Sequence, residues 1–98
     1  MDHKQEVLSY FNDKIFEPGI RFSKENNIPE IARGIRYTKM RMEQLPNATK
    51  VIQYFWSAVI GTEKSIKFAE LLKEHNVLRF EDIIEEVRVK FNHEYLNS

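Results

Sequence analysis

The densest apolar stretch of the chain runs from Asn47 to Gly61, with the sequence NATKVIQYFWSAVIG. Beyond its first turn, only Gln53 and Ser57 interrupt the apolar side chains. At about 100° per residue these apolar positions cover nearly the whole circumference of a helix, and such a helix is normally buried. The pattern therefore predicts a central helix over residues 47–60, with Asn47 as its N-cap and Gly61 just past its end.

Near the N-terminus, Asp2 can cap a helix whose apolar residues recur at helical spacing. These residues are Val7, Leu8, Phe11 and Ile15. The sequence Glu17-Pro18-Gly19 is predicted to end this helix, because proline and glycine are typical of turns. Residues 23–27 are expected to form one short helical turn. Asn27 is then expected to cap the next helix, with Pro29 in its first turn.

The segment from Pro29 to Leu45 has two chemically different faces if it forms one helix. The predicted inner face lies within about 80° and carries Ile31, Ile35, Thr38, Met42 and Leu45. The predicted outer face carries Arg33, Arg36, Tyr37, Met40 and Gln44, with Lys39 and Arg41 at its flanks. An ordinary solvated helix face is rich in Glu, Lys and Ser, so this outer face is a candidate binding surface.

Two further helices are predicted in the C-terminal half. The first begins at Thr62 and reaches about His75, where Asn76 is a suitable stop. The second runs from about Phe80 to Leu96, and its apolar residues keep the helical spacing closely. They are Phe80, Ile83, Ile84, Val87 and Phe91. The whole pattern predicts an all-α fold: one domain over residues 1–98, with about five helices packed around the helix at 47–60.

The charges of the chain are unevenly distributed. The 98 residues include 15 basic and 15 acidic side chains, so the formal net charge is zero. Bulk charge alone therefore does not hold the chain on DNA or on an anionic membrane. Residues 33–50, however, contain five basic residues and one acidic residue, Glu43, which gives this segment +4 and the remainder −4.

The absence of cysteine excludes disulfides, thiolate metal sites and thiol catalysis. The N-terminus lacks the apolar stretch of a signal peptide. The longest apolar run is also shorter than the roughly 20 residues that a membrane span needs. We therefore expect a cytoplasmic protein that does not associate with a membrane.

The predicted outer face at residues 33–44 is the leading functional candidate. Arg and Tyr are enriched in binding hot spots, and both suit phosphate contact and base stacking. The alternative is structural: Tyr37 and Met40 would pack under another element, and the arginines would pair with Glu70, Glu74 or the acidic last helix. The sequence leaves both interpretations open.

Within this segment, residues 34–40, GIRYTKM, followed by Leu45, resemble the turn and recognition helix of helix-turn-helix DNA-binding domains. The resemblance covers about residues 27–45. It implies that Gly34 makes the turn, that Ile35 and Met40 pack inward, and that nearby basic and aromatic residues approach DNA. A continuous helix instead places Met40 outward. Arg36 also stands where those domains usually have a small capping residue.

Other candidate chemistry is better explained by structure. Glu81/Glu85 and Asp82/Glu86 have a spacing that could chelate a hard cation, but acidic residues are also typical of a helix's first turn. The three histidines, at positions 3, 75 and 93, show no metal-ligand spacing. Trp56 is expected to anchor the core. We therefore expect no catalytic residue, no metal site, no cofactor and no enzymatic activity.

Two functions fit this sequence. The first is a small accessory or regulatory protein in replication or transcription, which binds nucleic acid or a larger nucleic-acid-processing partner through the outer face. The second is an adaptor or inhibitor that uses Tyr37 and Met40 to bind a protein. A homodimer and a heteromeric subunit both stay open.

Overall fold

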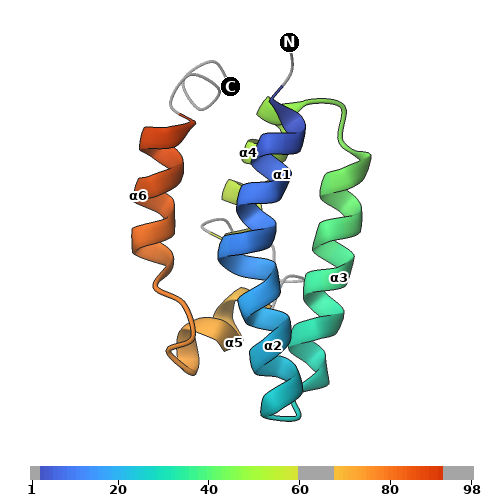
Figure 1. Ribbon diagram of the computed structural model, residues 1–98, viewed down its shortest axis with the longest axis vertical. Coiled ribbons are helices and arrows are strands. Elements are labelled where there is room, and N and C mark those ends of the chain that lie inside the picture. The colour runs from blue at the N-terminus through green and yellow to red at the C-terminus, as the bar shows by residue number, and fades with distance from the viewer. Residues whose placement is uncertain (1–2, 60–67, 92–98) are drawn as a thin grey trace.

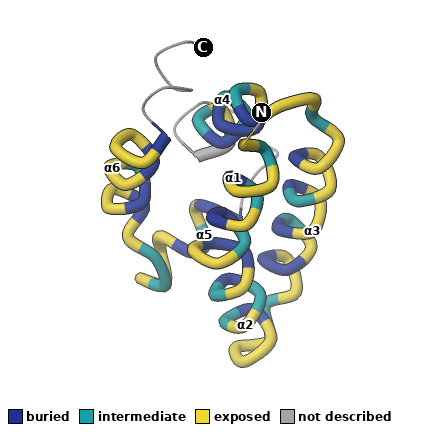
Figure 2. The backbone as a smooth tube through the Cα atoms, turned by 45° about the horizontal axis from the view of Figure 1, so that its top comes forward, coloured by how far each residue is buried: buried dark blue, intermediate teal, exposed yellow. Residues whose placement is uncertain are grey.

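The computed structural model describes residues 3–59 and 68–91, and every element within these two ranges is a helix (Figure 1). In chain order they are α1 (Lys4–Phe11), η1 (Asn12–Phe16), α2 (Glu17–Glu25), α3 (Pro29–Gln44), α4 (Ala48–Val59), α5 (Phe68–Glu74) and α6 (Phe80–Lys90). The predicted all-α fold is confirmed. The helices share one hydrophobic core, and their dark-blue buried positions face one another in Figure 2.

The first three elements follow one another without a break, so residues 4–25 form one long helix in the middle of Figure 1. The predicted end of the first helix at Glu17-Pro18-Gly19 is therefore wrong. The connecting element η1 is a π-helical turn, in which the amide of Glu17 donates to the carbonyl of Asn12, five residues earlier. Proline has no amide hydrogen, and its ring crowds the preceding turn. The wider turn accommodates Pro18 in the first turn of α2.

Gly19 lies in a close contact between helices and not in a turn. It is buried, and its φ is not positive. A Cβ at this position would lie 2.5 Å from Cδ1 of Ile35 on α3 and 3.4 Å from Cδ1 of Leu72 on α5. Glycine therefore lets three helices approach one another at this point.

The connection between α2 and α3 is short and heavily hydrogen-bonded. Asn27 has a φ of 54°, so it occupies the left-handed position after α2, and the amide of Ile28 donates back to the carbonyl of Ser23 at 2.9 Å. Asn27 therefore ends α2 and does not cap α3, contrary to prediction. The buried hydroxyl of Ser23 donates to the carbonyl of Ile28 and accepts from the amide of Ala32.

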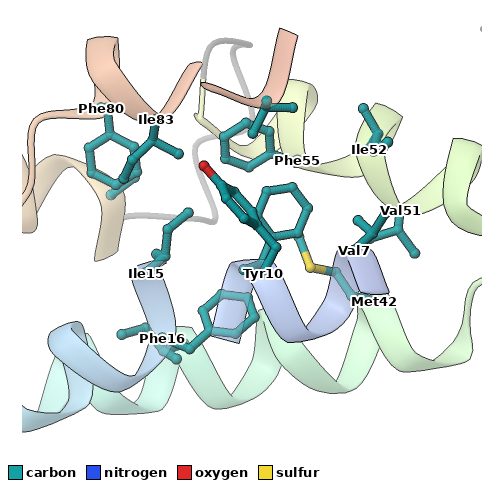
Figure 3. Close-up of a cluster of buried hydrophobic side chains, with 14 of the residues drawn as sticks. Val7, Tyr10, Ile15, Phe16, Met42, Val51, Ile52, Phe55, Phe80 and Ile83 are labelled. Carbon is teal, nitrogen blue, oxygen red and sulfur yellow. The ribbon is translucent and has the colours of Figure 1, made fainter. Parts of the chain in front are cut away.

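Helix α4 begins as predicted, because Asn47 Oδ1 accepts a hydrogen bond from the amide of Lys50 at 3.0 Å. It supplies Val51, Ile52 and Phe55 to the core (Figure 3), and the Phe55 ring stacks on Phe11 of α1 with centroids 4.6 Å apart. The helix is not buried all round, however, because Ser57 is exposed and Tyr54 and Trp56 are only partly buried. Gly61, the predicted end signal, lies outside the described residues.

The two C-terminal helices also bury apolar side chains. In α5 these are Phe68, Ala69 and Leu72. Of the apolar residues predicted for the last helix, Phe80, Ile83 and Val87 are buried in α6, Phe91 is buried just past its end, and Ile84 is partly buried. Asn76 stops α5 as predicted: its φ is 55°, and the amide of Val77 donates to the carbonyl of Leu72. The predicted cap at Thr62 and the end of the last helix at Leu96 lie outside the described residues, as does the cap at Asp2.

Candidate binding surface

The outward side of α3 has the orientation that its spacing predicts. Ile31, Ile35, Thr38 and Met42 are buried, while Leu45 follows the helix and is partly buried. The opposite side of the helix, here called the α3 face, consists of exposed side chains: Arg33, Arg36, Tyr37, Met40, Arg41 and Gln44. Tyr37 is 51% exposed and Met40 is 47% exposed, so the alternative that these two side chains pack under another element is not observed.

Among the described residues, the arginines of the α3 face also have none of the carboxylate partners that the structural alternative requires. The ion pairs between described residues are His3–Glu6, Lys14–Glu86, Arg79–Asp82 and Arg88–Glu85. None of them involves Arg33, Arg36 or Arg41. The acidic helix α6 is not placed to supply such partners, because α6 and α3 flank the long helix of residues 4–25 on opposite sides (Figure 1).

Lys39 differs from the other predicted site residues. It is only partly exposed, and its Nζ donates a hydrogen bond to Oδ1 of Asn12 at 2.9 Å. This contact joins α3 to η1 and points the lysine toward the long helix. Lys39 therefore lies at the border of the α3 face, and its hydrogen bond to Asn12 fixes its position.

Gly34 does not make a turn. Helix α3 is continuous from Pro29 to Gln44, and Met40 faces outward, as the continuous-helix alternative requires. A Cβ on Gly34 would lie 3.2 Å from Cβ of Phe68, so this glycine permits close packing of α5 against α3. The turn and the inward Met40 that the helix-turn-helix resemblance implies are therefore not found, and membership of that family stays a prediction.

Lys24 is a candidate site residue that the sequence analysis missed. It lines a hollow of about 330 Å³ between α2 and α3, together with Arg36 of the α3 face. The other lining residues are Ile20, Ser23, Asn27, Pro29 and Ala32. Lys24 reaches this hollow because α2 is helical throughout residues 17–25, whereas the Pro-Gly pair had been interpreted as a turn. Lys24 could have been found by continuing the helical periodicity past Pro18.

A second hollow, of about 430 Å³, lies between α1 and α3. Its lining residues are Gln5, Leu8, Ser9, Asn12, Lys39 and Glu43. Here the one lysine already binds Asn12, and an acidic side chain is present. The two hollows therefore differ in electrostatic character, and the one between α2 and α3 is the more basic.

The acidic residues of α6 and the histidines were the other candidates for chemistry, and those described make contacts that hold the fold together. Glu86 accepts a hydrogen bond from the hydroxyl of Tyr10 at 2.9 Å and lies 3.8 Å from Nζ of Lys14. The imidazole of His75 lies against the ring of Phe22, with centroids 5.3 Å apart. Within residues 3–59 and 68–91, no three His, Cys, Asp or Glu side chains form a group able to hold a metal ion. His93 lies outside these ranges.

Trp56 is partly buried, and its ring is tilted against Phe55 with centroids 5.6 Å apart. Trp56 was predicted to anchor the core; it packs against the core from its edge and is not itself fully buried. In the described part of the chain, no helix is long and apolar enough to cross a lipid bilayer.

No protein-family model matches the chain, and neither a curated protein nor a solved structure matches it at a significant level. The chemistry of the α3 face and of its adjoining hollow is therefore what points to a function.

Proposed function

We propose that this protein is a small, non-enzymatic accessory or regulatory protein that binds nucleic acid through the α3 face. One observation supports the proposal above the others. Arg33, Arg36 and Arg41 share an exposed helix surface with Tyr37, and no carboxylate of the described chain pairs with them. Arginine suits phosphate contact, and a tyrosine ring offers a stacking surface for a base.

The proposal includes the setting in which such a protein works. It acts in the cytoplasm, in a replication or transcription process, alone, as a homodimer or as a subunit of a larger machine. The outward direction of Met40 adds an apolar side chain to the basic surface, which suits a partner that combines phosphates with unstacked bases.

Salt dependence of binding tests this proposal directly. Fluorescence polarisation with labelled single-stranded and duplex oligonucleotides would be measured between 50 and 200 mM salt. Contacts from three arginines to phosphates predict that affinity falls roughly 10- to 50-fold over this range, since each phosphate contact releases condensed counterions. Failure of the wild-type protein to bind any DNA or RNA probe at low salt would overturn the proposal.

A matched pair of charge reversals assigns the surface. Arg36→Glu removes a cation and adds a repulsive charge, so we expect at least a 10-fold loss of affinity with unchanged thermal stability. Arg21→Glu is the control, because Arg21 is an exposed arginine on α2 that lines neither hollow. It should stay within about twofold of wild type, as expected for a charge outside the contact surface.

The second candidate function is a protein–protein adaptor or inhibitor that uses the same face. The exposure of Tyr37 and Met40 favours it, because Tyr is enriched in hot spots and Met at interfaces. Binding of this kind should persist at 500 mM salt and should be lost in Tyr37→Ala. A partner that elutes at moderate salt would instead favour electrostatic binding.

A further inference from the structure

The hollow between α2 and α3 has features of a phosphate site. Lys24 enters it from α2 and Arg36 enters it from α3, so two cations on different helices border one space. Among the lining residues that the structure describes, none is acidic. Two cations that border one hollow, with no carboxylate among its described lining residues, make the hollow electropositive, and such a space favours an anion.

The walls of the hollow are held in place before any ligand arrives. Ser23, whose side chain is buried, ties the turn at Ile28 to the amide of Ala32. The side-chain amide of Asn26 donates to the carbonyl of Phe22 at 3.1 Å, which reinforces the end of α2. A preformed site loses less conformational entropy on binding than a flexible one.

The size and the floor of the hollow indicate what accompanies the anion. A volume of about 330 Å³ is at the small end of ligand sites, which span roughly 300–1,000 Å³. Ile20, Pro29 and Ala32 supply apolar surface, and Asn27 supplies an amide. This combination suits a phosphate together with part of a sugar or base. The hollow at Glu43 has an acidic wall, and its lysine is already hydrogen-bonded to Asn12, so it is a poorer phosphate site.

We infer that the hollow binds a phosphate group, with Lys24 and Arg36 as its paired cations, and that this phosphate belongs to a nucleic-acid strand bound on the α3 face. The inference rests on the proposed function for the origin of the phosphate. It extends the binding surface from α3 onto α2 and adds Lys24 to its residues.

The test compares Lys24→Gln with Arg21→Gln. Both substitutions remove one exposed cation from α2, but only Lys24 lines the hollow. For a single-stranded probe, Lys24→Gln should weaken binding about threefold to 10-fold at 50 mM salt. It should also reduce the slope of log affinity against log salt by about 0.7, which corresponds to one phosphate contact. Arg21→Gln should change neither quantity.

A second measurement uses pyrophosphate alone, followed through the backbone amide resonances of Ser23, Asn27 and Ala32. These resonances should shift in the wild-type protein and stay unchanged in Lys24→Gln. If the wild-type protein binds the oligonucleotide and Lys24→Gln binds it equally well, the inference is overturned while the proposed function stands. If the protein binds pyrophosphate but no oligonucleotide, the hollow is a phosphate site for a small phosphorylated ligand, and the proposed nucleic-acid function is overturned. If neither binds, both are overturned.

Discussion

The hydroxyl of Tyr10 donates a hydrogen bond of 2.9 Å to the carboxylate of Glu86, a residue 76 positions later in the chain. This bond fastens α6 to α1. The Tyr10 ring is buried in the core (Figure 3), and it meets the Phe91 ring edge-to-face with centroids 5.5 Å apart, so a hydrogen bond and apolar packing act together here. Burial raises the pKa of the Tyr10 hydroxyl above its ordinary value, and the hydrogen bond to Glu86 and its charge act in the same direction.

The raised pKa of Tyr10 makes stability depend on alkaline pH. In the unfolded chain the hydroxyl loses its proton near pH 10, while in the folded protein it keeps the proton to higher pH. The unfolded state then binds fewer protons than the folded state, so the free energy of unfolding should fall as pH rises above about 10. Below pH 10 this contribution is fully present. Urea denaturation at pH 7, 9, 10 and 11 measures it.

Tyr10→Phe is the matching variant. It should lower the free energy of unfolding at pH 7 by about 1 kcal/mol, because one partly buried hydrogen bond is lost and Glu86 can be solvated. It should also flatten the decline above pH 10. Tyr37→Phe, at an exposed tyrosine, is the control and should follow wild type. A decline as steep in Tyr10→Phe as in wild type would show that other groups cause it.

Gly19 yields a prediction in which packing opposes helix propensity. Alanine in a helix is normally favoured over glycine by about 1 kcal/mol. A Cβ at Gly19, however, would approach Cδ1 of the buried Ile35 to 2.5 Å, and overpacking of this kind costs about 1–3 kcal/mol. Gly19→Ala should therefore lower the free energy of unfolding by roughly 1 kcal/mol, as measured by chemical denaturation.

A double-mutant cycle isolates the contact between Gly19 and Ile35. Ile35→Val removes the Cδ1 atom and alone costs about 0.5–1.5 kcal/mol. Combined with Gly19→Ala, it should cost less than the sum of the two single changes, because the deleted atom is the one that the new Cβ meets. If the two free-energy changes were simply additive, the destabilisation by Gly19→Ala would come from a contact other than the one with Ile35.

The local patterns in the sequence predicted most of the helical structure. The cap at Asn47, the stop at Asn76 and both faces of α3 depend on residues close together in the chain, and all three are observed. Patterns of this kind are reliable because capping and amphipathic spacing are properties of one helix. They were sufficient to find the exposed residues of the α3 face.

The errors arose where contacts between helices override local signals. Proline and glycine are common in turns, but here both lie within a helix. The π-helical turn accommodates Pro18, and the close approach of neighbouring helices requires the absence of a side chain at Gly19. Phe16 is also buried, although the predicted apolar face of the first helix ended at Ile15. Lys24 was missed for the same reason, because its place in the hollow that Arg36 also lines depends on a helix that the pattern ended too early.

Thr38 carries a buried hydroxyl on the inner side of α3. The residue is 1% exposed, and no atom of the described chain forms a hydrogen bond with its Oγ1. Thr38→Val replaces this hydroxyl by a methyl group of similar shape, so it should raise the free energy of unfolding by about 1 kcal/mol. Thr38→Ser keeps the hydroxyl and loses the methyl group, and it should destabilise the protein. A less stable valine variant would show that Oγ1 has a partner.

Tyr37 separates the role of stacking from that of charge on the α3 face. Because the side chain is half exposed, Tyr37→Ala should change the free energy of unfolding by no more than about 0.5 kcal/mol. If the ring stacks on a base, the same change should weaken single-strand binding by roughly 5- to 150-fold, since such stacking contributes about 1–3 kcal/mol.

The salt dependence of Tyr37→Ala then identifies the kind of contact. Tyr37→Ala removes no charge, so the slope of log affinity against log salt should equal that of wild type. Arg33→Gln removes one cation, so it should reduce the slope by the amount that corresponds to one phosphate contact. Tyr37→Phe should bind as wild type, because it retains the ring. If Tyr37→Ala kept full affinity while Arg36→Glu lost it, the α3 face would contact phosphates without stacking on a base. Tyr37 would then have no role in nucleic-acid binding, and its exposure would favour a protein as its partner.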